Sequence, residues 1–353
     1  MKSNFVSIVA DSTSFEKGGC QSGDTLSDHG SESTAANGLC RILSLDGGGA
    51  KGFYTLGVLK EVEGMLGCRL HERFDLVFGT STGAIIAALI GLGYSVDEIH
   101  DLYKQYVPTI MSATAPAAKS AALEALAKQV FKDQTFADVK TGIGIVTTNW
   151  VTERPMIFKG SIGQAHGRKG TFKPGFGVLV ADAVIASCSA YPFFQRKTVV
   201  TADGDSIVLI DGGFCANNPT LYAIADAVVA MKRPHSEVRV VSVGVGEYPE
   251  PTPRFFSTKW FQQRYINAVP GLNLSVALVQ KTFEINTRSL DQLRAILYKD
   301  IKTVRISEAF TEPTMATDLF EHDLTKLNIL RQRGRNSFAL HEPELREYLG
   351  VQS

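Results

Sequence analysis

The fold is decided by a strand-like run, a five-residue turn and a helix-like run: Phe74-Asp75-Leu76-Val77-Phe78, Gly79-Thr80-Ser81-Thr82-Gly83 and Ala84-Ile85-Ile86-Ala87-Ala88-Leu89-Ile90. A G-x-S-x-G turn between a strand and a helix is typical of a strained elbow that raises a serine hydroxyl above a sheet as a nucleophile. We therefore predict that Ser81 is catalytic. Gly79 and Gly83 support the motif, because strand and helix must pass close to each other there.

The alternation of apolar strands and helical patterns continues along the chain. Strands are predicted at 41–45, 74–78, 143–148, 206–210, 238–243 and 302–306. Helices are predicted at 53–66, 84–92, 117–131, 221–231, 274–297 and 319–338, and the alanine-rich one at 117–131 is expected on the rim. Short apolar strands separated by helices indicate an α/β fold whose mostly parallel central sheet is covered by helices on both faces.

The composition of the 353-residue chain argues against several classes of function. Hydrophobic residues make up 44% and charged residues 20%, and 36 basic residues balance 36 acidic ones. This balance is unlike that of proteins that coat nucleic-acid polymers or are drawn to anionic lipid by bulk charge. Five cysteines without C-x-x-C spacing indicate reduced thiols, and seven histidines without metal-binding spacing argue against a zinc site. We therefore expect a cytoplasmic protein without a zinc site.

The amino-acid composition divides the chain into two segments. Residues 11–38 are rich in Ser, Gly, Thr and Asp and contain too little apolar surface to offset the entropy of ordering, so 1–38 is predicted to be a flexible N-terminal segment. Residues 39–353 are predicted to form a single catalytic domain with a mainly helical C-terminal part from about 255. The apolar stretch at 83–93 is too short to cross a bilayer, and the long apolar core of a signal peptide is missing.

A glycine-rich loop follows the first predicted strand, with the sequence Asp46-Gly47-Gly48-Gly49-Ala50-Lys51-Gly52. Consecutive glycines at the start of a helix expose backbone N–H groups, which stabilise the negative charge of an acyl-transfer intermediate. Gly47, Gly49 and Gly52 also match the dinucleotide-binding pattern G-x-G-x-x-G. That interpretation needs an acidic residue at the end of the next strand, where the Ser81 turn stands instead. A loop that uses glycine for packing alone is the other alternative.

A carboxylate that could accept the serine proton is Asp211. The predicted strand 206–210 leads into it, and Gly212 and Gly213 follow. The carboxyl ends of strands in open α/β sheets share one ligand crevice, so we expect Asp211 near Ser81. A plain turn before a helix capped by Asn217 or Asn218 is the structural alternative. Three histidines downstream of the aspartate leave a Ser–His–Asp triad open: His235, His322 and His341.

The three motifs in this order resemble the patatin-like phospholipases, from about 41 to about 230, including the stretch 181–192. The resemblance implies a three-layer patatin-like fold and cleavage of phospholipid acyl esters, of the phospholipase A type, without a metal. It also implies a catalytic dyad of Ser81 and Asp211 without histidine. Lys51 would anchor the loop. The oxyanion hole would be formed by Gly47, Gly48 and Gly49. A non-catalytic module that binds lipid or nucleotide is an alternative of a different class.

The stretch 318–339 resembles the tail of bacterial patatin-like effectors of anti-phage signalling. Members of that group are switched on by cyclic di- or oligonucleotides and degrade the host membrane. The basic residues Arg331, Arg333 and Arg335 fit either phosphate contacts or a solvated helix face, so an activated and a constitutive enzyme both stay open. At 254–261, aromatic and basic residues fit an interfacial anchor or the core of a capping layer. We expect transient association with the inner face of the membrane.

Overall fold

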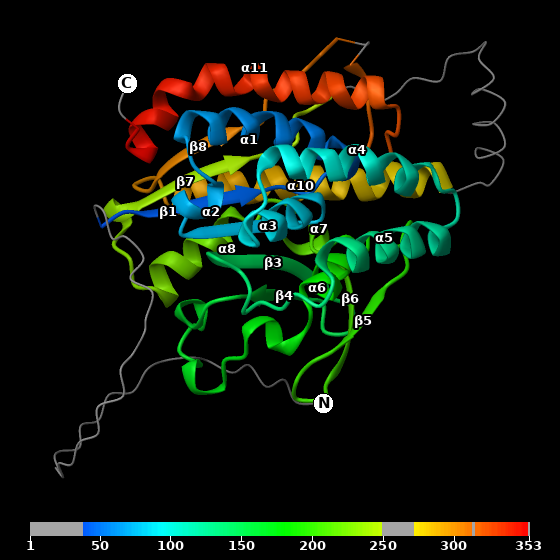
Figure 1. Cartoon of the computed structure of the whole chain (residues 1–353), viewed down its shortest axis with the longest axis horizontal. Coiled ribbons are helices and arrows are strands. Elements are labelled where there is room, and N and C mark those ends of the chain that lie inside the picture. Colours follow the sequence, from blue (N-terminus) through cyan, green and yellow to red (C-terminus); the bar gives the residue numbers. More distant parts are fainter. Residues whose placement is uncertain (1–37, 249–271, 313–314, 352–353) are drawn as a thin grey trace. The chain divides into compact units, whose positions relative to one another are not determined.

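The computed structural model describes residues 38–248, 272–312 and 315–351, with side chains described from Leu278 within the second range. In these residues, one eight-stranded sheet has the order β5-β6-β3-β2-β1-β7-β8, with β4 paired to β3 (Figure 1). The strands are β1 Cys40–Leu45, β2 Leu76–Thr80, β3 Gly142–Asn149, β4 Arg154–Lys159, β5 Lys197–Val200, β6 Ser206–Asp211, β7 Val238–Val243 and β8 Lys302–Ile306. The strands β1, β2, β3, β7 and β8 pair in parallel, whereas β4, β5 and β6 are antiparallel. The mostly parallel sheet confirms the predicted α/β class.

Helices connect most of these strands. They are α1 Gly52–Leu66, α2 Leu70–Arg73, α3 Thr82–Gly91, α4 Val96–Ser112, α5 Pro116–Phe131, α6 Val180–Ser187, α7 Gly213–Ala216, α8 Thr220–Ala225, α10 Leu272–Leu297 and α11 Leu324–Leu349. A π-helical turn, Asp226–Ala230, continues α8. The antiparallel strands β4 and β5 were not predicted, because both are edge elements with exposed or half-buried side chains rather than continuous apolar runs.

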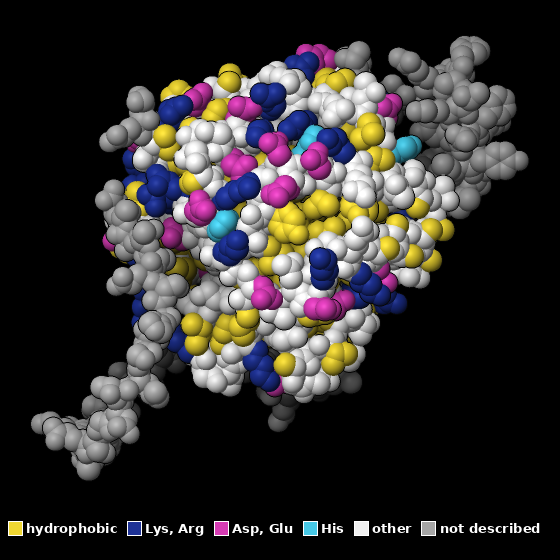
Figure 2. All heavy atoms as spheres, in the orientation of Figure 1, with side chains coloured by type: hydrophobic (Ala, Val, Ile, Leu, Met, Phe, Trp, Pro, Cys, Tyr) yellow, Lys and Arg dark blue, Asp and Glu magenta, His cyan; other side chains and the backbone are white. Residues whose placement is uncertain are grey.

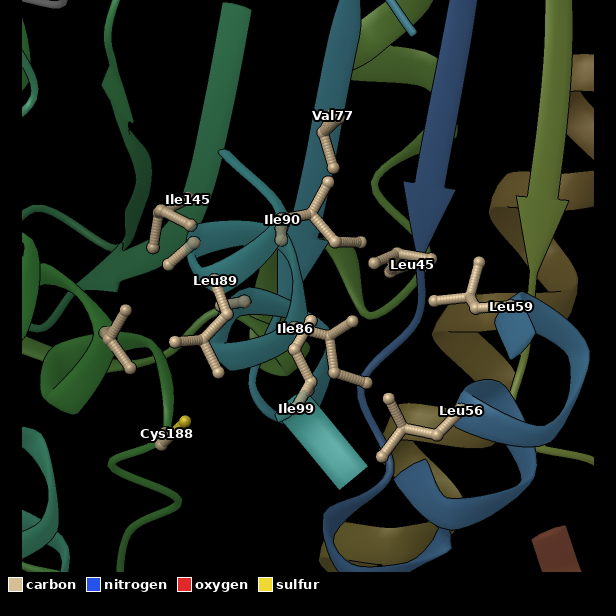
Figure 3. Packing of buried hydrophobic residues seen from close by; sticks show 14 of the residues in the cluster. Leu45, Leu56, Leu59, Val77, Ile86, Leu89, Ile90, Ile99, Ile145 and Cys188 are labelled. Atoms are coloured by element: carbon tan, nitrogen blue, oxygen red, sulfur yellow. The ribbon is translucent and has the colours of Figure 1, made fainter. Parts of the chain in front are cut away.

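Two hydrophobic clusters cover the two faces of the sheet, which gives three layers. Alternate residues of one strand enter different clusters: Leu43 of β1 packs with α1 and α3, whereas Ile42 packs with α8. Figure 3 shows the first cluster, in which side chains from three central strands meet those of α3 and α1. The labelled residues of this contact are Leu45, Val77, Ile145, Ile86, Leu89, Ile90, Leu56 and Leu59.

The C-terminal helix α11 lies along α1, as Figure 1 shows. Glycines allow the close approach, because a Cβ on Gly57 would meet the Arg331 carbonyl oxygen at 2.0 Å and one on Gly334 would meet the Tyr54 carbonyl oxygen at 2.0 Å. The prediction that this helix begins at 319 is wrong. It begins at Leu324, where the Asp323 carboxylate accepts a hydrogen bond from the Thr325 N–H at 2.8 Å.

Some sequence predictions fall outside the described residues. The aromatic and basic segment 254–261 lies there, as does almost all of the N-terminal segment 1–38. No helix within the described ranges has the length and apolar character needed to cross a membrane.

Candidate active site

Two strands meet end to end beside β3 and bring the serine and the aspartate together. Thr80, the last residue of β2, pairs with Val146 of β3, and Asp211, the last residue of β6, pairs with the next residue, Thr147. Over these residues β4 occupies the other edge of β3, so β6 lies on the same edge as β2. The two strands run in opposite directions, and their last residues, Thr80 and Asp211, lie opposite neighbouring residues of β3. Asp211 is therefore near Ser81, as predicted, and it is the last residue of a strand that runs antiparallel to β3.

Ser81 forms the elbow between β2 and α3. Its backbone has φ 54° and ψ −122°, a strained conformation for a residue with a side chain. The Ser187 hydroxyl supports the elbow, since it accepts a hydrogen bond from the Ser81 N–H at 2.9 Å and donates one to the Val146 carbonyl at 2.6 Å. A Cβ on Gly79 would meet the Gly83 carbonyl oxygen at 2.2 Å. The motif therefore requires glycine for the close packing that the sequence predicted.

The Ser81 hydroxyl donates a hydrogen bond to Asp211 Oδ2 at 2.8 Å. The other carboxylate oxygen, Oδ1, accepts one from the Gly213 N–H at 2.7 Å. Asp211 is fully buried, and burial raises its pKa to about 7, although the hydrogen bonds from Gly213 and Ser81 act to lower it. A carboxylate with such a pKa is a stronger base near neutral pH than an exposed aspartate.

The glycine loop lies against Ser81, but its three glycines differ. The Gly47 N–H donates to the Asn217 carbonyl at 3.0 Å and is therefore occupied. Gly48 precedes the 3₁₀ turn Gly49–Lys51, and Gly49 is its first residue. The first N–H groups of this turn have no acceptor within it. Gly49 has φ 57°, and a Cβ there would meet the Leu319 carbonyl oxygen at 2.4 Å. Gly48 and Gly49 line the same pocket as Ser81.

Asn217 holds this loop, a role that the sequence did not reveal. Besides accepting the Gly47 N–H, it donates from Nδ2 to the Gly47 carbonyl at 3.2 Å and to Thr287 Oγ1 at 2.8 Å. Its own N–H donates to Asn286 Oδ1 at 2.7 Å. Asn217 was considered only as a helix cap. Its position six residues after Asp211 gave a weak signal, whereas its partners on α10 are 69 and 70 residues away.

Asp46 is a second support that the sequence did not identify. Its buried carboxylate accepts two hydrogen bonds from Arg305 on β8, one of them from Nη1 at 2.9 Å. This pair ties the start of the glycine loop to a neighbouring strand. Lys51, predicted as the loop anchor, is buried, and burial lowers its pKa while the Glu284, Asp318 and Glu247 carboxylates act in the opposite direction.

The remaining motif glycines also pack closely. A Cβ on Gly52 would meet Thr82 Oγ1 at 2.5 Å, one on Gly83 the Leu45 carbonyl oxygen at 2.3 Å, and one on Gly212 the Val146 carbonyl oxygen at 2.2 Å. One on Gly213 would approach Asn217 Oδ1 and Phe283 at 3.0 Å. These glycines let the glycine loop, the elbow and the end of β6 converge.

An apolar pocket of about 980 Å³, including its mouth, opens at the serine. Most of its wall comes from α3, α4, α5 and α6, with Ser81 and Asp211 as its polar members together with the glycine loop. The predicted helix at 117–131 is present as α5, Pro116–Phe131. Its residues Leu123, Ala127 and Val130 line this pocket.

The three histidines considered for a triad lie elsewhere. His235 Nδ1 is 2.6 Å from Asp300 Oδ2, His341 Nε2 is 3.0 Å from Glu308 Oε1, and His322 is exposed, with Nδ1 3.2 Å from the Phe320 carbonyl oxygen. None of the three lines the pocket that contains Ser81. Within the described residues, no group of three or more His, Cys, Asp or Glu is arranged to hold a metal ion.

A strained serine elbow, a buried carboxylate and a glycine loop at the mouth of an apolar pocket define an α/β serine hydrolase. The patatin-like phospholipase family model matches residues 43–224, and the chain belongs to this family of hydrolases. The family is the one that the sequence motifs indicated.

Relatives with known names agree with this assignment. Over 314 residues the chain is 65% identical to the cUMP-AMP-activated phospholipase of Escherichia coli, covering 88% of this chain and 94% of that protein. It is 30% identical over 230 residues to the cGAMP-activated phospholipase of Vibrio cholerae, covering 58% of this chain and 62% of that one. Among solved structures, VipD from Legionella pneumophila matches with 13% identity and a TM-score of 0.43, covering 89% of this chain and 68% of that chain.

Proposed function

We propose that the protein is a phospholipase A type lipid acyl hydrolase that works through a dyad of Ser81 and Asp211. One observation carries the proposal: the 2.8 Å hydrogen bond from the Ser81 hydroxyl to Asp211 Oδ2, in a strained elbow that lines an apolar pocket. A serine hydroxyl becomes a nucleophile when a neighbouring base accepts its proton. Asp211 is the hydrogen-bond acceptor in that position.

The reaction proceeds in two similar halves. Ser81 Oγ attacks the ester carbonyl while its proton passes to Asp211, and the N–H groups of Gly48 and Gly49 stabilise the oxyanion. Each such donor contributes roughly 3 kcal/mol to lowering the barrier. Asp211 then returns the proton to the departing lysophospholipid oxygen, and a water molecule attacks the acyl-enzyme in the same way. No step requires a metal.

The pocket supports a lipid substrate. Its wall is made mainly of aliphatic and aromatic side chains, which suit an acyl chain. Figure 2 shows hydrophobic side chains gathered near the middle of the face on which α3, α4 and α5 lie, with charged residues around them. Such a surface suits transient contact with the inner face of the membrane, where the enzyme would meet phospholipid.

We further propose that a cyclic dinucleotide activates the enzyme, as part of bacterial anti-phage defence. The names of the Escherichia coli and Vibrio cholerae relatives, activated by cUMP-AMP and cGAMP, support this. The 65% identity favours cUMP-AMP. The activator would be a ligand of the protein and take no part in the chemical step.

The experiment is lipidomics of fatty acids released from mixed phospholipid vesicles, with and without cUMP-AMP, by wild type, Ser81→Ala and the exposed control Ser289→Ala. We expect release by wild type and Ser289→Ala and none by Ser81→Ala. Fluorophosphonate labelling under the same conditions reports the nucleophile directly. Fatty-acid release that survives in Ser81→Ala would refute the dyad.

A further inference from the structure

A second cavity shares the glycine loop with the catalytic pocket. It has about 1430 Å³ of empty space, including its open side, and its wall combines the loop, the residues after β7 and β8 and the middle of α10. Polar and charged side chains make up much of this wall, in contrast to the apolar pocket. Gly48, Phe283 and Leu319 line both cavities, so the two cavities are immediate neighbours.

The cavity presents cations that suit a phosphate. Lys51 is only 4% exposed, and within the described residues its ammonium has no hydrogen-bond or ion-pair partner. Lys281 and Arg288, two helical turns apart on α10, lie at the same cavity and are more than half exposed. Arg288 forms an ion pair with Glu247 at 2.8 Å, and both side chains are exposed. An anionic ligand can take the place of the Glu247 carboxylate at little cost in free energy.

The cavity also presents surfaces that suit nucleobases. Tyr248 and Phe310 both line it and stack with ring centroids 5.2 Å apart at 19°. The Tyr248 hydroxyl is buried and has no hydrogen-bond partner among the residues that the structure describes. Glu284 and Asp291 add acceptors for exocyclic amines or ribose hydroxyls. Cations for phosphates, aromatic rings and carboxylates together match a nucleotide better than a lipid headgroup or a free phosphate.

The cavity is linked to the reaction centre by a short chain of contacts. Thr287 lines it and accepts the hydrogen bond from Asn217 Nδ2, and Asn217 in turn holds Gly47 through both its N–H and its carbonyl. Gly47 precedes Gly48 and Gly49, which line the catalytic pocket. A ligand that shifts α10 or Lys51 therefore acts on the oxyanion loop without touching Ser81.

We propose that this polar cavity is the effector site, binding the phosphodiesters and bases of a cyclic dinucleotide between Lys51, Lys281, Arg288 and Tyr248. The inference rests on the proposed activation by a nucleotide and adds its site and its route to the oxyanion loop. Bound nucleotide fixes Gly48 and Gly49 in the orientation that receives the oxyanion.

The test is a charge-reversal pair, Lys281→Glu with Arg288→Glu, in the full chain. Both side chains are exposed, so the fold is expected to survive. The matched control is Lys232→Glu with Arg233→Glu, two cations that line a different surface pocket. Isothermal titration with cUMP-AMP, cGAMP and glycerophosphoethanolamine measures binding. Fatty-acid release from vesicles measures activation, and hydrolysis of a soluble short-chain ester without nucleotide measures basal activity.

We expect the variant to bind cUMP-AMP about 100-fold more weakly than wild type and the control, since each reversal replaces a charge-assisted contact with repulsion. Basal ester hydrolysis is expected to stay at the wild-type level. Unchanged nucleotide affinity in the variant, or tighter binding of glycerophosphoethanolamine than of either nucleotide, overturns the site. If Ser81→Ala still releases fatty acids, the proposed function is refuted. The nucleotide titration would still show whether the polar cavity binds the nucleotide.

Discussion

The two cavities that share the glycine loop differ in the chemistry of their walls, and this difference fits the proposed division between effector binding and reaction. The pocket at Ser81 is lined mainly by apolar side chains of α3 to α6 and buries Asp211, so the proposed dyad lies where charge is poorly solvated. The second cavity is lined by charged side chains and is more open to solvent. The glycine loop lines both cavities, and Asn217 connects it to α10 through hydrogen bonds to Gly47 and Thr287.

The largest effect is expected on the catalytic side, from Asp211→Asn. The amide keeps the size of the carboxylate but cannot accept the serine proton, so kcat/KM for phospholipid should fall by about 10³- to 10⁴-fold. Affinity for cUMP-AMP in the polar cavity should not change. Steady-state kinetics and calorimetry on one preparation measure both. Loss of nucleotide affinity in this variant would show that the Asp211 carboxylate itself contributes to nucleotide binding.

Asn217→Ala addresses the connection between the cavities. Without the bonds to Gly47 and Thr287 the oxyanion loop loses its support, and we expect kcat to fall by about 100-fold with a smaller change in KM. Asn336→Ala, an exposed position on α11, is the control. Circular dichroism establishes that the variant is folded. A rise in KM alone, with kcat kept, would assign Asn217 to substrate binding instead.

Ala127→Phe tests whether the apolar pocket holds the acyl chain. Ala127 is buried on α5 and lines the pocket, so a phenyl ring there fills space that a long chain needs. We expect about 10-fold slower hydrolysis of long-chain esters, with short-chain esters nearly unaffected. Ala125→Phe places the same ring on the exposed side of the helix. Equal losses for short and long chains would place the acyl group elsewhere.

The pH dependence of kcat/KM reports the burial of Asp211. Because burial raises its pKa to about 7, the carboxylate that accepts the serine proton is formed only as the pH rises through that value. Below it, kcat/KM for a soluble ester should fall about tenfold per pH unit. An activity that stays level down to pH 5 would indicate an aspartate with a pKa close to its usual value of about 3.9.

The last prediction concerns stability. The folded carboxyl holds its proton up to about pH 7, whereas the unfolded one releases it near pH 4, so wild-type stability falls as pH rises between these values. Asp211→Asn lacks this titration. Its free energy of unfolding relative to wild type should rise across this window, by up to about 1.4 kcal/mol per pH unit, and level off above it. Urea titrations at several pH values measure the difference, and a constant difference would contradict the raised pKa.

The sequence by itself determined the local features. Six of the eight strands, the Ser81 elbow and the glycine loop follow from apolar runs and glycine positions, because backbone sterics and burial act over a few neighbouring residues. The family follows from the order of three motifs. The closeness of Asp211 to Ser81 was expected as well, but the sequence does not show the direction of its strand, since no local pattern distinguishes a parallel strand from an antiparallel one.

Only the tertiary structure decided which distant residues meet. The end-to-end approach of β2 and β6 depends on both pairing with β3, and the supports of the glycine loop, Arg305 and Asn286, come from elements far along the chain. The contribution of α5 to the wall of the apolar pocket and the polar cavity beside the loop arise in the same way. Contacts of this kind depend on how whole helices and strands pack, and a sequence pattern describes each element only by itself.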